Sequence, residues 1–518
     1  MLHLRRLLIL CHRYLGIAIS FVVVVWFASG IVMMYAGGMP RVDPQLRLER
    51  LPTLDLARVQ LSPHDAAQRA AAAGITGQPS LTTVLGRPAY RFQGREAATL
   101  FADSGELLDA IDVGTAQALA SGFLDVPVAQ VRLDRTVTEP DQWTLNWRGR
   151  GGSLYKFEVD DGLGTQVYVS AQTADITQLT TRRQRALAWM GTIPHWIYFS
   201  ALRTNQPRWS KIVVGLSAVA CVLAVLGMIL TITQFRRTQP FRWSLAVPYR
   251  GWMRWHYILG AIFGVFAFTW AFSGLLSMEP FAWTNASGLE IPRDVFSGGE
   301  PDLASFGSID GTALQRTLGQ RSIKELGFRR IHDQNYYDVA VTDDTGATRA
   351  PPVHEPYSVE RRNQADALLV DAATLTLQSQ GFSSASILQR VQAVLPPGVH
   401  IAEHTVLNDY DSYYYSRNRQ APLPVLRIKF DDPTRTWLYV DPATSDVVAF
   451  VHRFSRLERW LYNGLHSLDF KFWYSRRPLW DLGMLVLLLG GLAMSTLGLY
   501  LGVKRLIRDL RSIRSASM

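Results

Sequence analysis

Four long apolar segments divide the chain into alternating apolar and polar stretches. They run from Leu15 to Tyr35, Ile212 to Ile232, Tyr257 to Met278 and Leu482 to Val503. Each is long enough to cross a bilayer as a helix, which takes about 20 residues. The first is too long for the core of a signal peptide and no clear cleavage site follows it, so we expect it to remain as an anchor. The pattern therefore predicts an α-helical membrane protein with four transmembrane helices.

The two long polar stretches predict external α+β domains. Within each, apolar residues recur at helical spacing behind a capping residue, as in Ser62-Pro63, and alternate around polar turns in the manner of hairpins. The expected helices cover 62–68, 114–122, 311–319 and 383–395, and the expected hairpins cover 100–108, 167–179, 368–377 and 439–448.

The same arrangement of residues occurs twice. His12, Trp26, Ser29 and Gly30 recur 244 positions later as His256, Trp270, Ser273 and Gly274. A second series recurs 271 positions later, in which His195, Trp209 and Gly227 match His466, Trp480 and Gly498. We interpret this as an internal duplication. The second copy is longer by the difference of the two intervals, and we expect the extra residues around 281–301 and 343–363.

The apolar segments and the repeat together predict eight parts of the chain. They are a cytoplasmic start with the first transmembrane helix (1–35), an external domain (36–181), an interfacial helix with the second transmembrane helix (182–235), a cytoplasmic loop (236–255), the third transmembrane helix (256–279), a second external domain (280–452), an interfacial helix with the fourth transmembrane helix (453–503) and a basic cytoplasmic tail (504–518).

Basic residues set the predicted orientation. The short segments beside the apolar stretches carry an excess of arginine and lysine, while the whole 518-residue chain has a net charge of +10. The rest of the chain is therefore close to neutral, and the basic character indicates topology rather than binding to nucleic acid. We expect both termini and the middle loop to be cytoplasmic.

Histidines at both ends of each repeat are the candidate chemistry. Only two matched pairings keep partners at one membrane depth, His12 with His256 and His195 with His466. Facing imidazoles can fill both axial positions of a haem iron. The chain has no Cys-x-x-Cys-His sequence, so we expect two b-type haems that are not covalently attached. The alternative for any single histidine is a hydrogen-bonding group at the membrane interface.

Glycine and tryptophan share the helix face of the first pair. At about 100° per residue, Gly16 and Trp26 lie close to the direction of His12, and Gly260 and Trp270 repeat this for His256. A small residue one turn from a ligand leaves room for a flat macrocycle. Trp26 and Trp270 lie near the expected depth of the outer haem, where they either relay electrons or simply pack the axis.

The repeated membrane sequences resemble the PepSY-associated transmembrane family. The resemblance is carried by the His-x-x-x-Gly start at His12 and His256, the Trp-x-x-Ser-Gly end of the same segments, the Gly-rich last helix with its basic tail, and Tyr-Val-Asp-Pro-x-Thr at Tyr439. It covers nearly the whole chain. Members include inner-membrane reductases linked to ferric-siderophore uptake, so the resemblance implies four helices with two haems b and two PepSY-like periplasmic domains.

Four arginines are candidate partners of haem propionates. Arg182 and Arg185 precede His195 as Arg453 and Arg456 precede His466, and arginine forms charge-assisted hydrogen bonds to carboxylates. The alternative is a solvated or lipid-headgroup contact. Aromatic and arginine residues also gather in two long hairpins, where they either meet substrate or form a β-rich interface; these are Trp143, Trp147, Arg148, Arg150, Tyr410, Tyr413, Tyr414, Tyr415, Arg417 and Arg419.

Together with the two histidine pairs, the family resemblance implies a haem-dependent ferric-siderophore reductase in the bacterial inner membrane. Electrons would enter from quinol or a cytoplasmic flavoprotein, because the chain has no Gly-x-Gly-x-x-Gly nucleotide motif of its own. They would leave to a periplasmic acceptor, for which a ferric siderophore is the first choice. The rivals are a reductase of copper or of a protein partner, and a non-enzymatic sensor or assembly factor that binds a peptide or protein.

Overall fold

The computed structural model describes residues 2–92, 97–147, 152–236, 246–281, 289, 291–342, 367–415 and 421–516. The chain separates into two compact units. The membrane unit comprises Met1–Met39, Ala186–Ala286 and Arg453–Met518, and the β-rich unit comprises Pro40–Arg185 and Ser287–His452. Most of the extra length expected in the second copy, around 281–301 and 343–363, lies outside the described residues.

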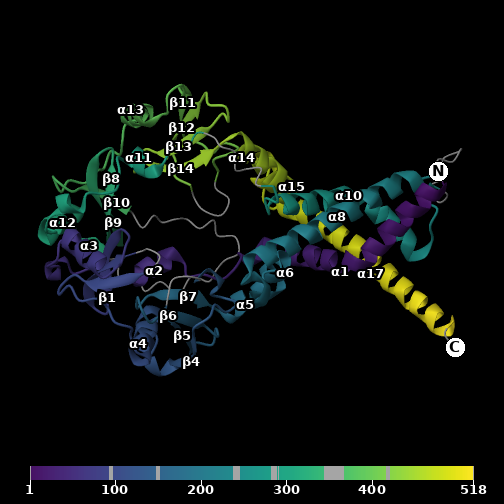
Figure 1. The fold of residues 1–518 in the computed structure, drawn as a ribbon, viewed down its shortest axis with the longest axis horizontal. Helices are drawn as coiled ribbons and strands as arrows, with labels where there is room; N and C mark the ends of the chain where they lie inside the picture. The colour runs from purple at the N-terminus through teal and green to yellow at the C-terminus, as the bar shows by residue number, and fades with distance from the viewer. Residues whose placement is uncertain are drawn as a thin grey trace. The chain divides into compact units, whose positions relative to one another are not determined.

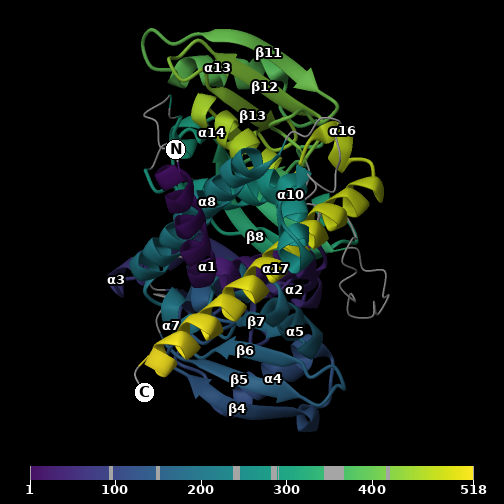
Figure 2. The same cartoon turned by 90° about the vertical axis from the view of Figure 1, so that its right-hand side faces the viewer.

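Four helices of the membrane unit are long and apolar enough to cross a membrane, among the residues that the structure describes. They are α1 (Leu2–Ala36), α8 (Gln206–Gln234), α10 (Gly251–Leu276) and α17 (Leu479–Ala516). Each contains one of the four predicted apolar segments. Helices α1 and α10 each pack against both α8 and α17, as Figure 1 and Figure 2 show. Residues on α1 and α10 can therefore face each other across the interior of the bundle.

Short helices connect the β-rich segments to α8 and α17. Before α8 they are α5 (Arg182–Met190), α6 (Thr192–Trp196) and α7 (Ser200–Arg203). Before α17 they are α14 (Arg453–Glu458), the π-helix η5 (Arg459–Gly464), α15 (Leu465–Ser467) and α16 (Lys471–Tyr474). Matched contacts shape both connections. The indole nitrogen of Trp209 donates to the carbonyl of Trp196 at 3.0 Å, and that of Trp480 donates to Ser467 at 3.1 Å.

The β-rich unit contains two matching four-stranded antiparallel sheets. One has the order β4-β5-β6-β7 and the other β11-β12-β13-β14. Helix α4 (Val113–Leu124) packs on the first through Ala116 and Ala120, and α13 (Ser384–Val394) supplies Ile387 and Val391 to the core of the second. The strands are β4 (Val131–Val137), β5 (Leu154–Val159), β6 (Gln166–Ser170), β7 (Ile176–Thr180), β11 (Ile401–Leu407), β12 (Val425–Phe430), β13 (Trp437–Asp441) and β14 (Asp446–Val451).

A six-stranded sheet joins strands from the two halves of the chain, in the order β10-β9-β8-β1-β2-β3. The junction is antiparallel pairing of β1 with β8, in which Leu81 lies opposite Leu326. The hairpins expected at 100–108 and 368–377 begin on β3 and β10 and are closed by single bridges, Leu100 with Leu107 and Val370 with Leu377. The hairpins β1–β2 and β8–β9 were not predicted. The shared sheet was not predicted either, because strand partners far apart in sequence leave no local signal. The strands are β1 (Pro79–Val84), β2 (Arg87–Phe92), β3 (Ala98–Phe101), β8 (Ser322–Ile331), β9 (Gln334–Thr342) and β10 (Ala367–Asp371).

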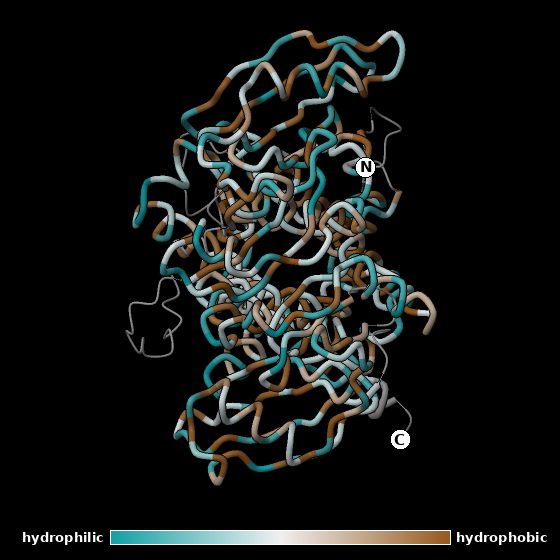
Figure 3. The backbone as a smooth tube through the Cα atoms, turned by 90° about the vertical axis from the view of Figure 1, so that its left-hand side faces the viewer, coloured by the Kyte–Doolittle hydropathy of each residue, from teal (hydrophilic) through white to brown (hydrophobic). Residues whose placement is uncertain are grey.

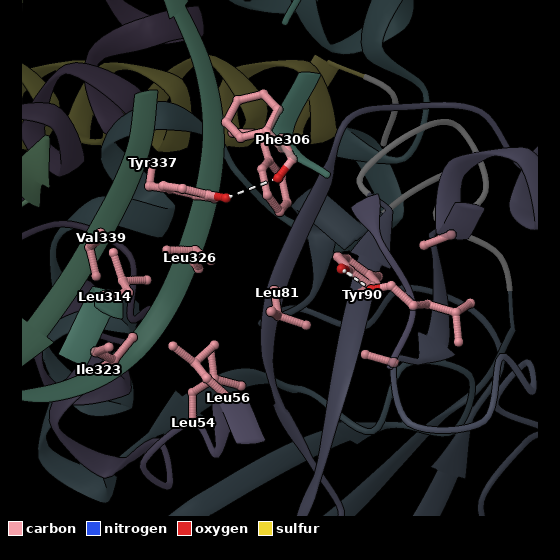
Figure 4. Close-up of a cluster of buried hydrophobic side chains, with 14 of the residues drawn as sticks. Leu54, Leu56, Leu81, Tyr90, Phe306, Leu314, Ile323, Leu326, Tyr337 and Val339 are labelled. Atoms are coloured by element: carbon pink, nitrogen blue, oxygen red, sulfur yellow. Dashed lines mark hydrogen bonds between the residues drawn. The ribbon is translucent and has the colours of Figure 1, made fainter. Parts of the chain in front are cut away.

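Helices α3 (Pro63–Ala72) and α12 (Gly311–Leu318) contribute to the core of this sheet. Ser62 caps α3 by accepting a hydrogen bond from the Asp65 amide, as the sequence predicts. The two buried tyrosines of the core direct their hydroxyls to backbone carbonyls, Tyr90 to Leu61 and Tyr337 to Phe306 (Figure 4). Figure 3 shows hydrophobic and hydrophilic segments interspersed along the chain. Burial alternates from residue to residue along β7, whereas β2 is buried along almost its whole length. Smaller helices of this unit are α2 (Pro44–Arg50) and α11 (Arg293–Ser297).

Candidate functional site

The structure brings the four repeated histidines together as two pairs. His12 on α1 and His256 on α10 have ring centroids 6.4 Å apart, with an angle of 39° between the ring planes. His195 on α6 and His466 on α15 have ring centroids 6.1 Å apart and ring planes 78° apart. These are the two pairings expected from the matched positions in the sequence.

The Nδ1 atom of each histidine in the first pair points to a backbone carbonyl on a neighbouring helix. His12 Nδ1 lies 3.2 Å from the Leu223 oxygen of α8, and His256 Nδ1 lies 3.0 Å from the Met494 oxygen of α17. Leu223 and Met494 are themselves 271 positions apart. A carbonyl can only accept, so each Nδ1 carries the proton and each Nε2 keeps its lone pair for a metal.

Serine hydroxyls hold the second pair in the same way. His195 Nδ1 lies 3.1 Å from Ser29 Oγ and 3.2 Å from the Trp26 carbonyl oxygen. His466 Nδ1 lies 2.9 Å from Ser273 Oγ. Ser29 and Ser273 are both buried, at 1% and 0% exposure. All four imidazoles thus have one nitrogen occupied by the protein, as metal-binding histidines usually do.

Burial also keeps one of these rings neutral. His195 lies on α6, outside the four membrane-spanning helices, and burial lowers its pKa to about 4. At neutral pH the ring is therefore uncharged. A neutral imidazole is the form that binds a metal.

Glycines lie directly against the histidine rings. A Cβ atom placed on Gly227 would be 3.1 Å from Cε1 of His12, and one on Gly498 would be 3.1 Å from Cε1 of His256. In the second pair, Gly30 approaches His195 to 3.6 Å and Gly274 approaches His466 to 4.0 Å by the same measure. Any larger residue at Gly227 or Gly498 would press on the ring, so these positions set where the imidazole can lie.

The glycines predicted to make room for a macrocycle lie elsewhere. A Cβ on Gly16 would be nearest to the Leu223 side chain, and one on Gly260 nearest to the Met494 side chain. Both glycines therefore face the residues whose carbonyls hold His12 and His256. A Cβ at either position would make only an ordinary contact, at 3.9 Å and 4.0 Å, and a cofactor-binding role for these glycines stays a prediction.

Trp26 and Trp270 have different surroundings. Trp26 contributes its backbone carbonyl to His195. Trp270 packs edge-on against Phe27, with ring centroids 5.5 Å apart, and its indole nitrogen is buried without a hydrogen-bond partner among the described residues. The packing alternative therefore has direct support for Trp270, and electron relay by either tryptophan stays a prediction.

The four arginines that were predicted to contact propionates near the second pair differ in their contacts and in their exposure. Arg185 donates to the Thr180 hydroxyl at 2.9 Å and to the Gly164 carbonyl at 2.9 Å, so its guanidinium joins strand ends within the β-rich unit. Burial lowers the pKa of Arg185. Arg182 and Arg453 are exposed, and Arg456 is partly buried. These positions neither support nor contradict a contact between the four arginines and a haem propionate, which stays a prediction.

The aromatic hairpins turn their described rings inward. Trp143 and Trp147 pack on the cluster of Val137, Leu154 and Tyr168. Tyr414 is 4% exposed and stacks on Tyr439, with centroids 5.0 Å apart. Arg148, Arg150, Arg417 and Arg419 lie outside the described residues. Trp143, Trp147 and Tyr414 thus serve the sheet cores, and substrate contact by these hairpins stays a prediction.

The described residues contain no group of three or more His, Cys, Asp or Glu side chains that could hold a bare metal ion. The His-x-x-x-His sequence at His400 and His404 lies beside and on strand β11, and His400 contacts Asp431 instead. The sequence did not predict that the carbonyls of Leu223 and Met494 would bind the histidines, or that Gly227 would contact His12. Ser29 and Ser273, which contact the second pair, were visible in the sequence as repeated positions.

Two comparisons with known proteins bear on identity. No curated protein matches this sequence. The sequence profile of the family described as "PepSY-associated TM region" matches residues 9–505. That match includes the whole of α8 and α10, most of α1 and α17, and all four histidines of the two pairs. The chain is therefore a member of the PepSY-associated TM region family.

Proposed function

We propose that this protein is a membrane oxidoreductase that binds two haems b, one between His12 and His256 and one between His195 and His466. The main support for this proposal is the distance between the imidazole ring centroids of each pair, which is 6.4 Å in the first pair and 6.1 Å in the second. Two imidazoles on opposite sides of one iron have centroids about 6 Å apart, since each metal–nitrogen bond is about 2 Å and each centroid lies about 1 Å further away. Both pairs match this spacing.

Haem iron with two imidazole ligands exchanges single electrons and leaves no coordination position open. The chain supplies the groups that orient the imidazole rings. The carbonyls of Leu223 and Met494 and the hydroxyls of Ser29 and Ser273 orient the rings and hold the proton on Nδ1. Ser29 lies 17 residues beyond His12 on α1, so the two pairs are separated by roughly 26 Å along the helix. That separation places the pairs near opposite ends of the bundle.

The direction of transfer is part of the proposal. Basic residues in the last turns of α17 and near the start of α1 favour cytoplasmic termini in a bacterial inner membrane, and so a periplasmic β-rich unit. Quinol or a cytoplasmic flavoprotein would then supply electrons, and a ferric siderophore would accept them. Reduction suits iron release because iron(II) binds hard oxygen chelators less tightly than iron(III) does.

The matched hydrogen bonds at a 271-residue interval support an origin of both halves by duplication.

Haem content and its loss in single variants test the proposal. Purified protein from haem-replete cells should contain two haems per chain with low-spin spectra. His12→Ala or His256→Ala should remove one haem, and His195→Ala or His466→Ala the other. His404→Ala, on the exposed face of β11, is the matched control and should keep both. Colourless wild-type protein would overturn the proposal and favour a sensor or assembly factor, and loss of both haems from any one change would contradict the pairing.

The acceptor needs its own experiment. Dithionite-reduced protein should be mixed with a panel of ferric chelates, a cupric salt and buffer alone, and reoxidation followed in the haem absorption bands. We expect rapid reoxidation by ferric siderophores, with a rate that saturates with their concentration. Faster reoxidation by copper would instead assign a copper reductase.

A further inference from the structure

A polar cluster lies at the end of the membrane bundle that holds the start of α1. Arg5 donates from Nη2 to Oε1 of Gln234, the last residue of α8. Gln234 is 4% exposed, and its amide nitrogen is buried with no hydrogen-bond partner in the part of the chain that the structure describes. A buried donor without an acceptor is costly in apolar surroundings. The cluster therefore presents a buried donor for which the described residues offer no acceptor.

The cluster is aligned with the first histidine pair. Arg5 lies seven residues before His12 on α1, and Gln234 lies seven residues after Gly227, the glycine that faces His12. Because α1 and α8 run in opposite directions, both displacements lead to the same end of the bundle. Seven residues of helix correspond to about 10 Å. The edge of a porphyrin and its two-carbon carboxylate arm cover such a distance from a central iron.

Positive charge gathers at this point. The guanidinium groups of Arg5 and Arg236 are both close enough to Tyr249 to act on its hydroxyl electrostatically. The Arg236 amide donates to the Ala246 carbonyl at 3.0 Å, which holds the segment after α8 near the segment before α10. Arg5 bonds to a neutral amide, so that contact leaves its charge uncompensated. An anion would complete the arrangement.

The matched positions in the second half carry a different combination. Tyr249 stands 244 positions after Arg5, and Arg505 stands 271 positions after Gln234. Arg505 already bonds to Asp509, with a separation of 3.0 Å. The second half therefore offers a phenol and a neutralised cation where the first half offers a cation and an unpartnered amide. The matched positions of the two halves therefore differ in charge, and an anion would bind beside Arg5 and Gln234.

We infer that Arg5 and Gln234 bind a carboxylate, and that it is a propionate of the haem proposed between His12 and His256. This inference rests on the proposed function. Arginine forms strong charge-assisted hydrogen bonds to carboxylates, and the unpartnered Gln234 amide adds a second donor. Neither residue ligates the iron. Their role is to orient the macrocycle and to set the charge around it.

The test uses the full-length protein in detergent with both haems bound. Arg5→Met should lower the midpoint potential of one of the two haems, because loss of a cation favours the ferric form. Transfer of that haem to apomyoglobin should be faster by on the order of tenfold, the effect of losing one charge-assisted hydrogen bond. Gln234→Leu should act in the same direction, Gln234→Glu more strongly, and Arg5→Lys should restore most of the potential.

Arg6→Met is the matched control, since it removes the same charge from the next position, about 100° around the helix. Equal effects of Arg5→Met and Arg6→Met on both haems would overturn the inference while leaving the proposed function intact. Unchanged haem properties, combined with loss of co-purifying anionic lipid from Arg5→Met, would assign the cluster to a lipid phosphate and also overturn it. Absence of haem from the wild-type protein would mean that the proposed function itself had failed.

Discussion

The Nδ1 atom of His256 lies 3.0 Å from the carbonyl oxygen of Met494. This contact fixes the ring from the helix beside it, and Gly498 one turn further along α17 limits its movement on the other side. The same pair of restraints acts on His12 from α8.

Gly498→Val should displace the His256 ring. A Cβ at this position would already be 3.1 Å from Cε1 of His256, and valine adds two further carbons. We expect haem content to fall from two to one per chain, measured by the pyridine haemochrome assay. Gly215→Val on α8, where a Cβ would meet nothing within 4 Å, should retain both haems. Full haem content in Gly498→Val would argue against ligation by His256 in this position.

Ser273→Ala should weaken the second pair. The variant removes the hydroxyl that lies 2.9 Å from His466 Nδ1, and loss of such an outer contact typically costs about 10- to 100-fold in metal affinity. Competition of the purified protein with apomyoglobin measures this as faster loss of one haem. Ser277→Ala is the control, because it removes a hydroxyl that bonds to the Gly274 carbonyl at the C-terminal end of the same helix. Identical haem loss in both variants would show that the effect is not specific to the histidine contact.

The two pairs should differ in their ferric electron paramagnetic resonance signals. The ring planes are 78° apart for His195 and His466 but 39° apart for His12 and His256. Nearly perpendicular ligand planes leave two iron d orbitals close in energy, which produces the more anisotropic low-spin signal. We expect His195→Ala to remove the more anisotropic signal and His12→Ala the other. Two superimposable signals would contradict the difference in ring angle.

Leu314→Ala should destabilise the β-rich unit without changing the haem spectra. Leu314 is fully buried on α12 in the core of the six-stranded sheet, and such truncations cost about 2–5 kcal/mol. Chemical unfolding of the whole protein, followed by far-ultraviolet circular dichroism, should show an earlier transition for this unit. Leu133→Ala, at a position 42% exposed, should change it little. Loss of haem from Leu314→Ala at low denaturant concentration would contradict independent unfolding of the β-rich unit and the membrane unit.

Asp432 should make the β-rich unit sensitive to acid. Burial alone raises the pKa of Asp432, but hydrogen bonds from Thr434 and Thr436 outweigh burial and lower the pKa below its ordinary value. A lowered folded-state pKa contributes stability above the unfolded pKa of about 4, and this contribution is lost as the pH falls through the folded pKa. Asp432→Asn should cost about 1–3 kcal/mol at pH 7 and flatten the loss of stability below about pH 4. Thermal unfolding across pH 3–7 checks this, and parallel curves for both proteins would refute it.

Local patterns predicted the elements of this protein well. All four apolar segments form helices, and the helices expected at 62–68, 114–122, 311–319 and 383–395 are present as α3, α4, α12 and α13. Capping residues and alternation act within a few residues, so they can be read from the chain. The matched intervals also indicated which histidines would face each other, because equivalent positions in two copies of a helix lie at equivalent depth.

Tertiary structure alone decided what surrounds each histidine. Gly16 shares a helix face with His12, yet the residues that restrain the ring are Leu223 and Gly227 on α8. The rotation of each helix about its axis depends on side-chain packing against its neighbours, which local sequence does not encode. For the same reason the pairing of β1 with β8, and the contact of Arg5 with Gln234 across 229 positions, became visible only in the folded chain.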